Sequence, residues 1–397
     1  MLLAFILVIM VLLHVEFFVR NILFGTDEAN FFGFTIRYLF DQDVARLSLM
    51  FSLSCILAFA SSYLIAHRLA RIPRHWAYQP VSSRYPLPLW PLLTIGLLQV
   101  FASLSIAVQS GFVYQLIAER LEQAGFVLEL RIIFLLLLSH LLLNVRLDEV
   151  MSSPRFRSAR VITYLYVFAL LLLQARSRIF EIAAVLAFSQ LMWRGDRLRL
   201  KYFAMVGLAL ITPNIIVLGR LGWPEEFKTL VSGIFSFEYT VLLNNLLSAA
   251  IYAGPNVNVP FTFTPSLFMV LPSPIRSVLD IEIVKADYYE ELAEAADVRN
   301  GGFSLLAELF TNFGWQAVWI LGVIGALMGY INARALRVGR AGILISIAPL
   351  FYTAFILAFR NDLGVFIKYT VQLFVIASII NLLIAVATVQ RPTRRLV

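Results

Sequence analysis

The stretch LLLQARSRIFEIAAVLAF, from Leu171 to Phe188, places Arg176 and Arg178 inside a run that is otherwise almost wholly apolar. On either side, residues 161–174 and 179–193 predict two helices. At 1.5 Å per residue these helices are roughly 21 and 22 Å long. The hydrocarbon core of a bilayer is about 30 Å thick. Two such short helices joined by a tight turn would leave both arginines below the outer membrane surface.

The whole chain has the composition of a membrane protein. Of its 397 residues 60% are hydrophobic and 14% are charged, with a mean hydropathy of +0.83, whereas about a quarter of a soluble domain is charged. Long apolar runs recur from end to end, so we expect one integral membrane domain over residues 1–397. The first run has neither a basic n-region nor a cleavage site, which predicts a retained first helix. The single cysteine, Cys55, excludes a disulfide framework and a CxxC metal site.

The expected fold class is an all-α polytopic membrane protein with about ten transmembrane helices. An even number of helices places both termini on the same side of the membrane. The apolar runs that predict the helices are 2–20, 47–66, 88–110, 127–145, 161–174, 179–193, 202–219, 316–332, 343–360 and 363–390.

Basic residues indicate which side that is. The connections after the second, fourth, sixth and eighth helices, together with the C-terminal tail, hold 18 of the 32 basic residues. They hold only three acidic residues, Asp148, Glu149 and Asp196. The positive-inside rule therefore predicts that both termini are cytoplasmic. Because the positive charges form short clusters between apolar runs, the net charge of +8 does not indicate a nucleic-acid partner.

The opposite face carries a large loop, residues 220–302, between the seventh and eighth helices. Loops of this length are usually functional. Its apolar stretch Phe235–Ala253 is interrupted by Glu238, Asn244 and Asn245. We expect an interfacial or re-entrant helix there, because a full span would reverse every later loop and break the charge rule.

Five arginines are predicted to lie near one membrane depth on this outer side. Arg176 and Arg178 could snorkel to the surface or face a water-filled cavity that opens outward. A central intramembrane arginine costs about 2.5–3.5 kcal/mol, and arginine suits bidentate contact with phosphate. The grouping favours a site for an anionic ligand. Its other members are Arg220, Arg299, Arg360 and the carboxylates Glu308 and Asp362.

Several short motifs resemble those of the Wzy-type O-antigen polymerases, which polymerise oligosaccharide repeat units and are related to O-antigen ligases. The segment RNGGFSLLAELFTNFGW contains the Gly-rich turn, the glutamate (Glu308) and the Asn312–Phe313–Gly314 element of that family. LLLQARSRIFE is similar to its Ser-Arg turn, with Ala175 where a small residue is usual. MVLPSPIR and AFRNDL resemble its Pro-containing loop and its Arg-x-Asp turn. The motifs cover about a tenth of the chain, and the GT-C-like plan of ten helices with a late periplasmic loop extends the likeness.

The resemblance implies a glycosyltransferase of the bacterial inner membrane whose active site faces the periplasm. Donor and acceptor would be glycans linked to undecaprenyl pyrophosphate. A chain-length regulator is implied as a further partner besides the lipid bilayer. No cofactor and no metal site are expected.

The expected roles follow from the reaction. Arg176, Arg178 and Arg360 would stabilise the pyrophosphate leaving group, with Arg220 and Arg299 as second choices. Glu308 or Asp362 would serve as the base, although Asp362 could instead orient Arg360. The glycan-binding candidates are Asn312, Tyr288 and Tyr289, while Asn312 and Gly314 could also form only a turn before a helix.

Three other functions compete with this one. An O-antigen ligase resembles its relatives in carrying a histidine in the large periplasmic loop, but the four histidines here lie at or before residue 140. We expect His14 and His140 to be helix-packing groups. A metal-dependent lipid-phosphate glycosyltransferase would use acids of the first outward loop, such as Asp27, Glu28, Asp41 and Asp43. A lipid-linked glycan flippase would carry charges along a central path. Glu129, Arg131 and Glu181 are charged residues within helices that could pair with the arginine cluster.

Overall fold

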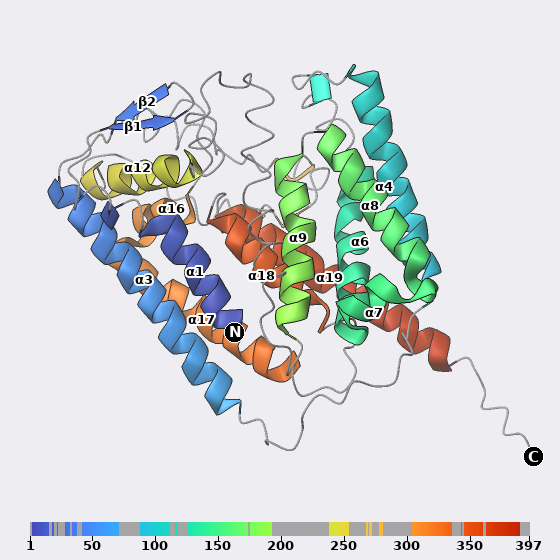
Figure 1. Ribbon diagram of the computed structural model, residues 1–397. Coiled ribbons are helices and arrows are strands. Elements are labelled where there is room, and N and C mark those ends of the chain that lie inside the picture. Colours follow the sequence, from blue (N-terminus) through green and yellow to red (C-terminus); the bar gives the residue numbers. More distant parts are fainter. Residues whose placement is uncertain are drawn as a thin grey trace, which may run out of the picture. The chain divides into compact units, whose positions relative to one another are not determined.

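The computed structural model is predominantly helical (Figure 1). It describes residues 2–15, 18–19, 22, 28–31, 34–37, 42–70, 88–111, 116–117, 125–173, 175–192, 238–253, 267–268, 270–271, 278–280, 304–335, 343, 345–359 and 363–389.

Four helical stretches in the described part of the chain are long and apolar enough to cross a membrane. They are Gln42–Leu69, Trp90–Gln109, Leu305–Ala333 and Phe366–Leu383. Three shorter apolar helices, Leu2–His14, Leu130–Asn144 and Ile347–Ala358, accompany them. The protein is therefore a helical membrane protein, as its composition predicts.

Nine of the ten predicted helices have a counterpart among the described residues, and the tenth, 202–219, lies outside them. The counterparts are α1 (Leu2–His14), α3 (Gln42–Leu69), α4 (Trp90–Gln109), α6 (Gly125–Asn144), α8 (Arg157–Leu172), α9 (Arg176–Leu191), α17 (Ala317–Ala335), α18 (Ile347–Ala358) and α19 (Leu363–Val389). The agreement arises because long apolar runs in a bilayer must satisfy their backbone groups internally, which helices do.

Two features differ from the expectation. First, α9 begins at Arg176, so both arginines belong to the first turn of the helix and not to the connection before it. Second, a short antiparallel pair of strands, β1 (Glu28–Phe31) and β2 (Phe34–Arg37), precedes α3, and the all-α prediction did not include it. Phe, Thr and Ile favour strands.

The chain divides into two compact units that interleave in sequence. The first comprises residues 1–72, 210–334 and 354–370, and the second comprises 73–209, 335–353 and 371–397. Both α18 and α19 contribute one end to each unit.

A close helix crossing organises the first unit. A Cβ added at Gly325 of α17 would collide with the carbonyl oxygen of Phe59 on α3, and one added at Gly329 would collide with that of Tyr63. The two glycines form a GxxxG pair, which lets helix backbones approach closely in a membrane. At the same crossing, the Asn332 amide donates a hydrogen bond of 2.7 Å to the Tyr63 hydroxyl.

Three further helices complete the described part of this unit. They are α1, α12 (Glu238–Ala253) and α16 (Leu305–Phe313), and α12 contacts α1, α3 and α16. The helix α12 lies where the sequence predicts an interfacial or re-entrant helix. At 1.5 Å per residue its 16 residues span about 24 Å, less than the hydrocarbon core. Its buried Asn244 donates to the carbonyl of Leu13 at 2.9 Å and contacts the His14 ring nitrogen at 3.1 Å.

The second unit is a bundle in which α4, α6 and α8 run side by side and α9 contacts α6 and α8 (Figure 1). A short helix, α7 (Leu147–Ser152), and a 3-10 turn, η1 (Pro154–Phe156), connect α6 to α8. Only three residues, 173–175, separate α8 from α9, so the predicted tight connection is confirmed. Arg178 lies in the first turn of α9, a helix that packs against α6 and α8.

Candidate functional site

The start of α9 concentrates positive charge. Arg176 is the first residue of the helix and Arg178 the third, and the first turn contains no acidic residue. The N-terminal end of a helix carries a partial positive charge of its own and exposes unpaired backbone N–H groups. Two arginines added to that end make it a place where an anion is stabilised.

A buried group of charged and polar side chains lies below this first turn. Arg131 of α6 forms an ion pair with Glu181 of α9, with 3.4 Å between Nη1 and Oε1. The two side chains are 16% and 5% exposed, so the pair is largely removed from solvent. The partner differs from the expectation, because Glu181 pairs with Arg131 of α6 and not with a member of the arginine cluster.

Tyr166 of α8 links the pair to the arginine cluster. Its hydroxyl donates to Oε1 of the buried Gln99 on α4 at 3.4 Å. The charges of Arg131, Arg178 and Glu181 all lie close enough to interact electrostatically with this hydroxyl. Four helices thus contribute to one largely buried group of polar and charged side chains. We call Gln99, Arg131, Tyr166, Arg178 and Glu181 the bundle cluster.

The bundle cluster has one positive charge more than it has negative charge. The positive charge at the start of α9 favours an anionic ligand there. In addition, Oε2 of Glu181 is buried and has no hydrogen-bond partner among the described residues. A buried acceptor without a partner costs about 1–3 kcal/mol, so a donor from a ligand would stabilise it.

Glu308 has a well-defined role in the first unit. It lies on α16, is 1% exposed, and its Oε2 accepts a hydrogen bond of 2.6 Å from the backbone N–H of Leu363. Leu363 is the first residue of α19. The carboxylate therefore caps the N-terminus of α19, where a negative charge is stabilised. In the sequence, Leu363 directly follows the predicted Arg-x-Asp turn, residues 360–362.

The Asn312–Phe313–Gly314 element forms a break between helices. The helix α16 ends at Phe313, and its N-cap is Ser304, whose hydroxyl accepts a hydrogen bond from the N–H of Ala307 at 3.4 Å. Gly314 has φ 55° and ψ −137°, a conformation that favours glycine. The Asn312 amide donates to the carbonyl of Glu308 at 2.8 Å. Of the turn predicted for Asn312 and Gly314, only Gly314 takes part, because Asn312 lies in the last turn of α16 and the 3-10 turn before α17 begins at Gly314.

Other predicted site residues lie outside the described residues. For Arg176 the structure describes the backbone position only. The remaining ones are Arg220, Arg299, Arg360, Asp362, Tyr288 and Tyr289.

The residues on which the competing functions depend have partners of their own. Besides the contact with Asn244, the ring of His14 lies 5.2 Å from that of Phe359. The ring nitrogen Nδ1 of His140 lies 2.9 Å from the Ser346 hydroxyl. Both histidines are buried, which confirms that they are packing groups. Asp43, predicted to lie in the first outward loop, belongs instead to the first turn of α3, where it is exposed and pairs with Arg46 at 3.2 Å.

Sequence reasoning did not select Gln99, Arg131 and Tyr166 as site residues. Arg131 is visible in the sequence as a charge close behind Glu129 in a run that is otherwise apolar. Gln99 and Tyr166 give no such signal, because single polar residues are frequent in transmembrane helices that pack together.

In comparisons with models of protein families, with curated proteins and with solved structures, nothing matches this chain. Among the described residues, no group of three or more His, Cys, Asp or Glu side chains could hold a metal ion.

Proposed function

We propose that this protein is a glycosyltransferase of the bacterial inner membrane that polymerises oligosaccharide repeat units carried on undecaprenyl pyrophosphate. In this proposal ten helices cross the membrane, both termini are cytoplasmic, and the reaction takes place on the periplasmic side. The observation that carries the proposal is the bundle cluster beneath the arginine-bearing first turn of α9. The motif resemblance to O-antigen polymerases names the anion as a pyrophosphate.

The chemistry fits a positively charged site. The bond between the sugar C1 and the pyrophosphate oxygen breaks, and a hydroxyl oxygen of the acceptor forms the new bond to C1. The hydroxyl proton passes to a carboxylate, and undecaprenyl pyrophosphate leaves with the electron pair. Negative charge therefore grows on the pyrophosphate in the transition state. Preorganised donors stabilise such charge most effectively in a site of low dielectric constant.

Arg176 and Arg178 bind the leaving pyrophosphate in this proposal, and Arg131 adds a third positive charge from α6. Glu181 has a positioning role: its ion pair holds the Arg131 side chain in place and neutralises part of the buried positive charge before the pyrophosphate binds. Arg360, Arg220 and Arg299 remain candidates for the same anion on sequence grounds.

Glu308 and Asp362 take different roles. The short hydrogen bond to Leu363 commits one oxygen of Glu308 to α19 and favours a positioning role. Asp362 precedes Leu363 in sequence and is the better candidate for the base that accepts the hydroxyl proton. Glu308 would then hold the start of α19 on which the Arg-x-Asp turn depends.

A polymerisation assay with purified protein tests the proposal. Lipid-linked repeat units from a host strain that lacks the gene are incubated with the protein in detergent, with and without EDTA, and the products are separated on a gel. We expect a ladder that persists in EDTA and is lost in Arg176→Ala and Arg178→Ala. Arg157→Ala is the matched control, because Arg157 is an exposed residue at the start of α8. A ladder that EDTA abolishes, or one that survives in both variants, contradicts the proposal.

A lipid-linked glycan flippase is the second candidate. The observation that favours it is the Arg131–Glu181 pair itself, because charges buried between membrane helices are typical of transport pathways. A flippase would bind the lipid-linked unit and move it between the leaflets of a reconstituted vesicle without forming a ladder.

A further inference from the structure

A cavity of about 470 Å³ lies in the second unit, between α6, α7 and α8. This volume falls in the range of about 300–1,000 Å³ that is typical of small-molecule sites. Its walls are largely aliphatic and include Leu138, Leu141 and Leu142 of α6 and Leu186 of α9. None of these residues belongs to the bundle cluster.

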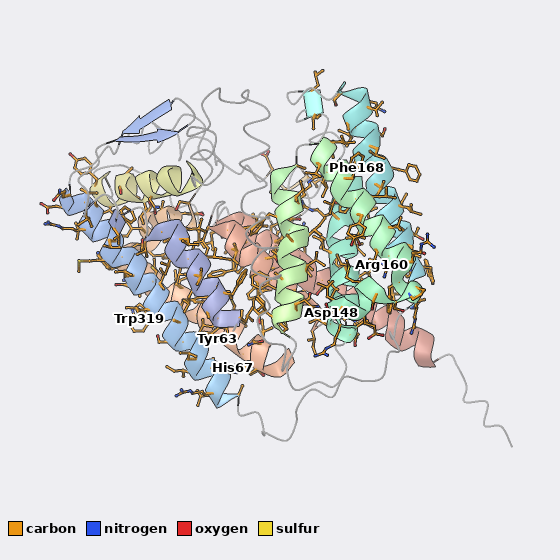
Figure 2. The ribbon with its side chains drawn as sticks, in the orientation of Figure 1. Tyr63, His67, Asp148, Arg160, Phe168 and Trp319 are labelled. Atoms are coloured by element: carbon orange, nitrogen blue, oxygen red, sulfur yellow. The ribbon has the colours of Figure 1, made fainter. Side chains whose placement is uncertain are left out.

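Two residues of opposite charge line the same cavity, Asp148 from α7 and Arg160 from α8 (Figure 2). Nη1 of Arg160 donates to the carbonyls of Val150, Met151 and Ser153 at 2.8, 2.6 and 3.1 Å. These contacts hold the guanidinium at the C-terminal end of α7, where a cation is stabilised. Its Nε and Nη2 form no hydrogen bond with any described residue, and Asp148 is exposed.

The lining of the cavity is aliphatic in one part and charged in another. Its aliphatic walls come from apolar helices, whereas its charged residues lie on α7 and in the first turn of α8, in the stretch that also carries Arg146, Arg155 and Arg157. The charge rule predicts this stretch at the cytoplasmic membrane surface. A lining that is aliphatic in one part and charged in another suits an amphiphile with an apolar chain and a charged head.

We propose that the cavity binds a zwitterionic glycerophospholipid with a free amine, as in phosphatidylethanolamine. An acyl chain contacts the leucines, the phosphodiester accepts hydrogen bonds from Arg160, and the ammonium group pairs with Asp148. A purely anionic phospholipid would satisfy Arg160 but face repulsion from Asp148. The trimethylated amine of phosphatidylcholine carries charge but has no N–H to donate. The opposite signs of the two residues therefore select the lipid with both groups.

The test uses the full chain, purified in detergent, stripped of lipid and titrated with single lipids under native mass spectrometry. We expect phosphatidylethanolamine to bind about tenfold more tightly than phosphatidylcholine or phosphatidylglycerol, a ratio that corresponds to about 1.4 kcal/mol. In Asp148→Asn the preference over phosphatidylcholine disappears. We choose Asp148 because it is exposed, whereas Arg160 also holds α7. In Glu149→Gln, the adjacent acid that does not line the cavity, the preference is unchanged.

A second variant, Leu186→Trp, fills part of the cavity and lowers the binding of every lipid. Three results would overturn the proposal: no lipid adduct at all, phosphatidylglycerol binding as tightly as phosphatidylethanolamine, or a preference that survives in Asp148→Asn. Because these measurements need no glycan substrate, their outcome is independent of the proposed polymerase function.

Discussion

Replacing Glu308 separates a positioning role from a catalytic one. In Glu308→Ala the N–H of Leu363 loses its acceptor, while Leu363 itself is 3% exposed. A hydrogen bond to a charged group contributes about 1.5–3 kcal/mol, so the free energy of unfolding should fall by that amount. In Glu308→Gln the amide oxygen can still accept the bond. The loss is then mainly the interaction of the charge with the helix N-terminus, about 0.3–1 kcal/mol and up to about 2 in partly buried geometries.

The assay pairs stability with activity. Unfolding in mixed micelles of increasing SDS fraction gives the stability of the wild type and of both variants, and the polymerisation ladder gives the rate. We expect Glu308→Gln to keep its rate within about tenfold of the wild type. Asp362→Asn should lose about 10²–10⁴-fold, which is the usual contribution of a general base. Asp43→Asn is the control for removing an acid from the first unit, because exposed ion pairs contribute about 0–1 kcal/mol.

One result would refute the reasoning. If Glu308→Gln is as stable as the wild type and yet loses about 10²-fold or more of its rate, Glu308 exchanges the proton itself. The hydrogen bond to Leu363 would then orient the base, and the roles assigned to Glu308 and Asp362 would be reversed.

Three further predictions concern packing and charge. Arg131→Met and Glu181→Leu should each lower the free energy of unfolding by about 3–5 kcal/mol, because each leaves the charge of the other residue buried without its partner. In a double-mutant cycle the double variant should lose less stability than the sum of the two single variants, and strict additivity would contradict the buried pair. Gly329→Ala should lower the stability in SDS unfolding by about 1–3 kcal/mol, because its Cβ would meet the backbone of Tyr63. Gly322→Ala is the control and should lower it less, because its Cβ would only approach the Ser62 hydroxyl to 3.2 Å. Equal losses in the two variants would argue against the close crossing of α3 and α17. Gly314→Ala should cost about 1–3 kcal/mol of strain in the same assay, and an unchanged stability would rule out the backbone conformation at the end of α16.

Much of the fold could be predicted because hydropathy is a local property. Each apolar run identifies its helix without reference to any other, as α4 and α19 show by ending within two residues of the predicted bounds. The strand pair β1–β2 was missed because each strand is only four residues long, too short for its alternation to stand out from the sequence around it. The start of α9 was placed too late because charged residues were taken as the end of an apolar run, although arginine is a good helix former.

The site was predictable only in part. Arg178 and Glu308 attract attention in the sequence as charges inside apolar stretches, and both are incorporated into helices that bury or half-bury them. Their partners could not be found in this way. Glu308 contacts Leu363, which lies 55 residues away in sequence, and Arg131 lies 50 residues before Glu181. Such pairs depend on how far each helix is rotated and shifted along its axis, which the apolar pattern leaves open.

The amino-acid sequence by itself determined that the protein is a helical membrane protein, where most of its helices lie, and which of its charges are costly to bury. Those properties follow from the free energy of moving each segment from water into lipid, which is nearly additive along the chain. The tertiary structure decided which charges neutralise one another: Arg131 with Glu181, and Glu308 with the start of α19. The physical reason is that an ion pair or a capping hydrogen bond acts over about 3 Å, so it exists only where packing brings two helices into one register.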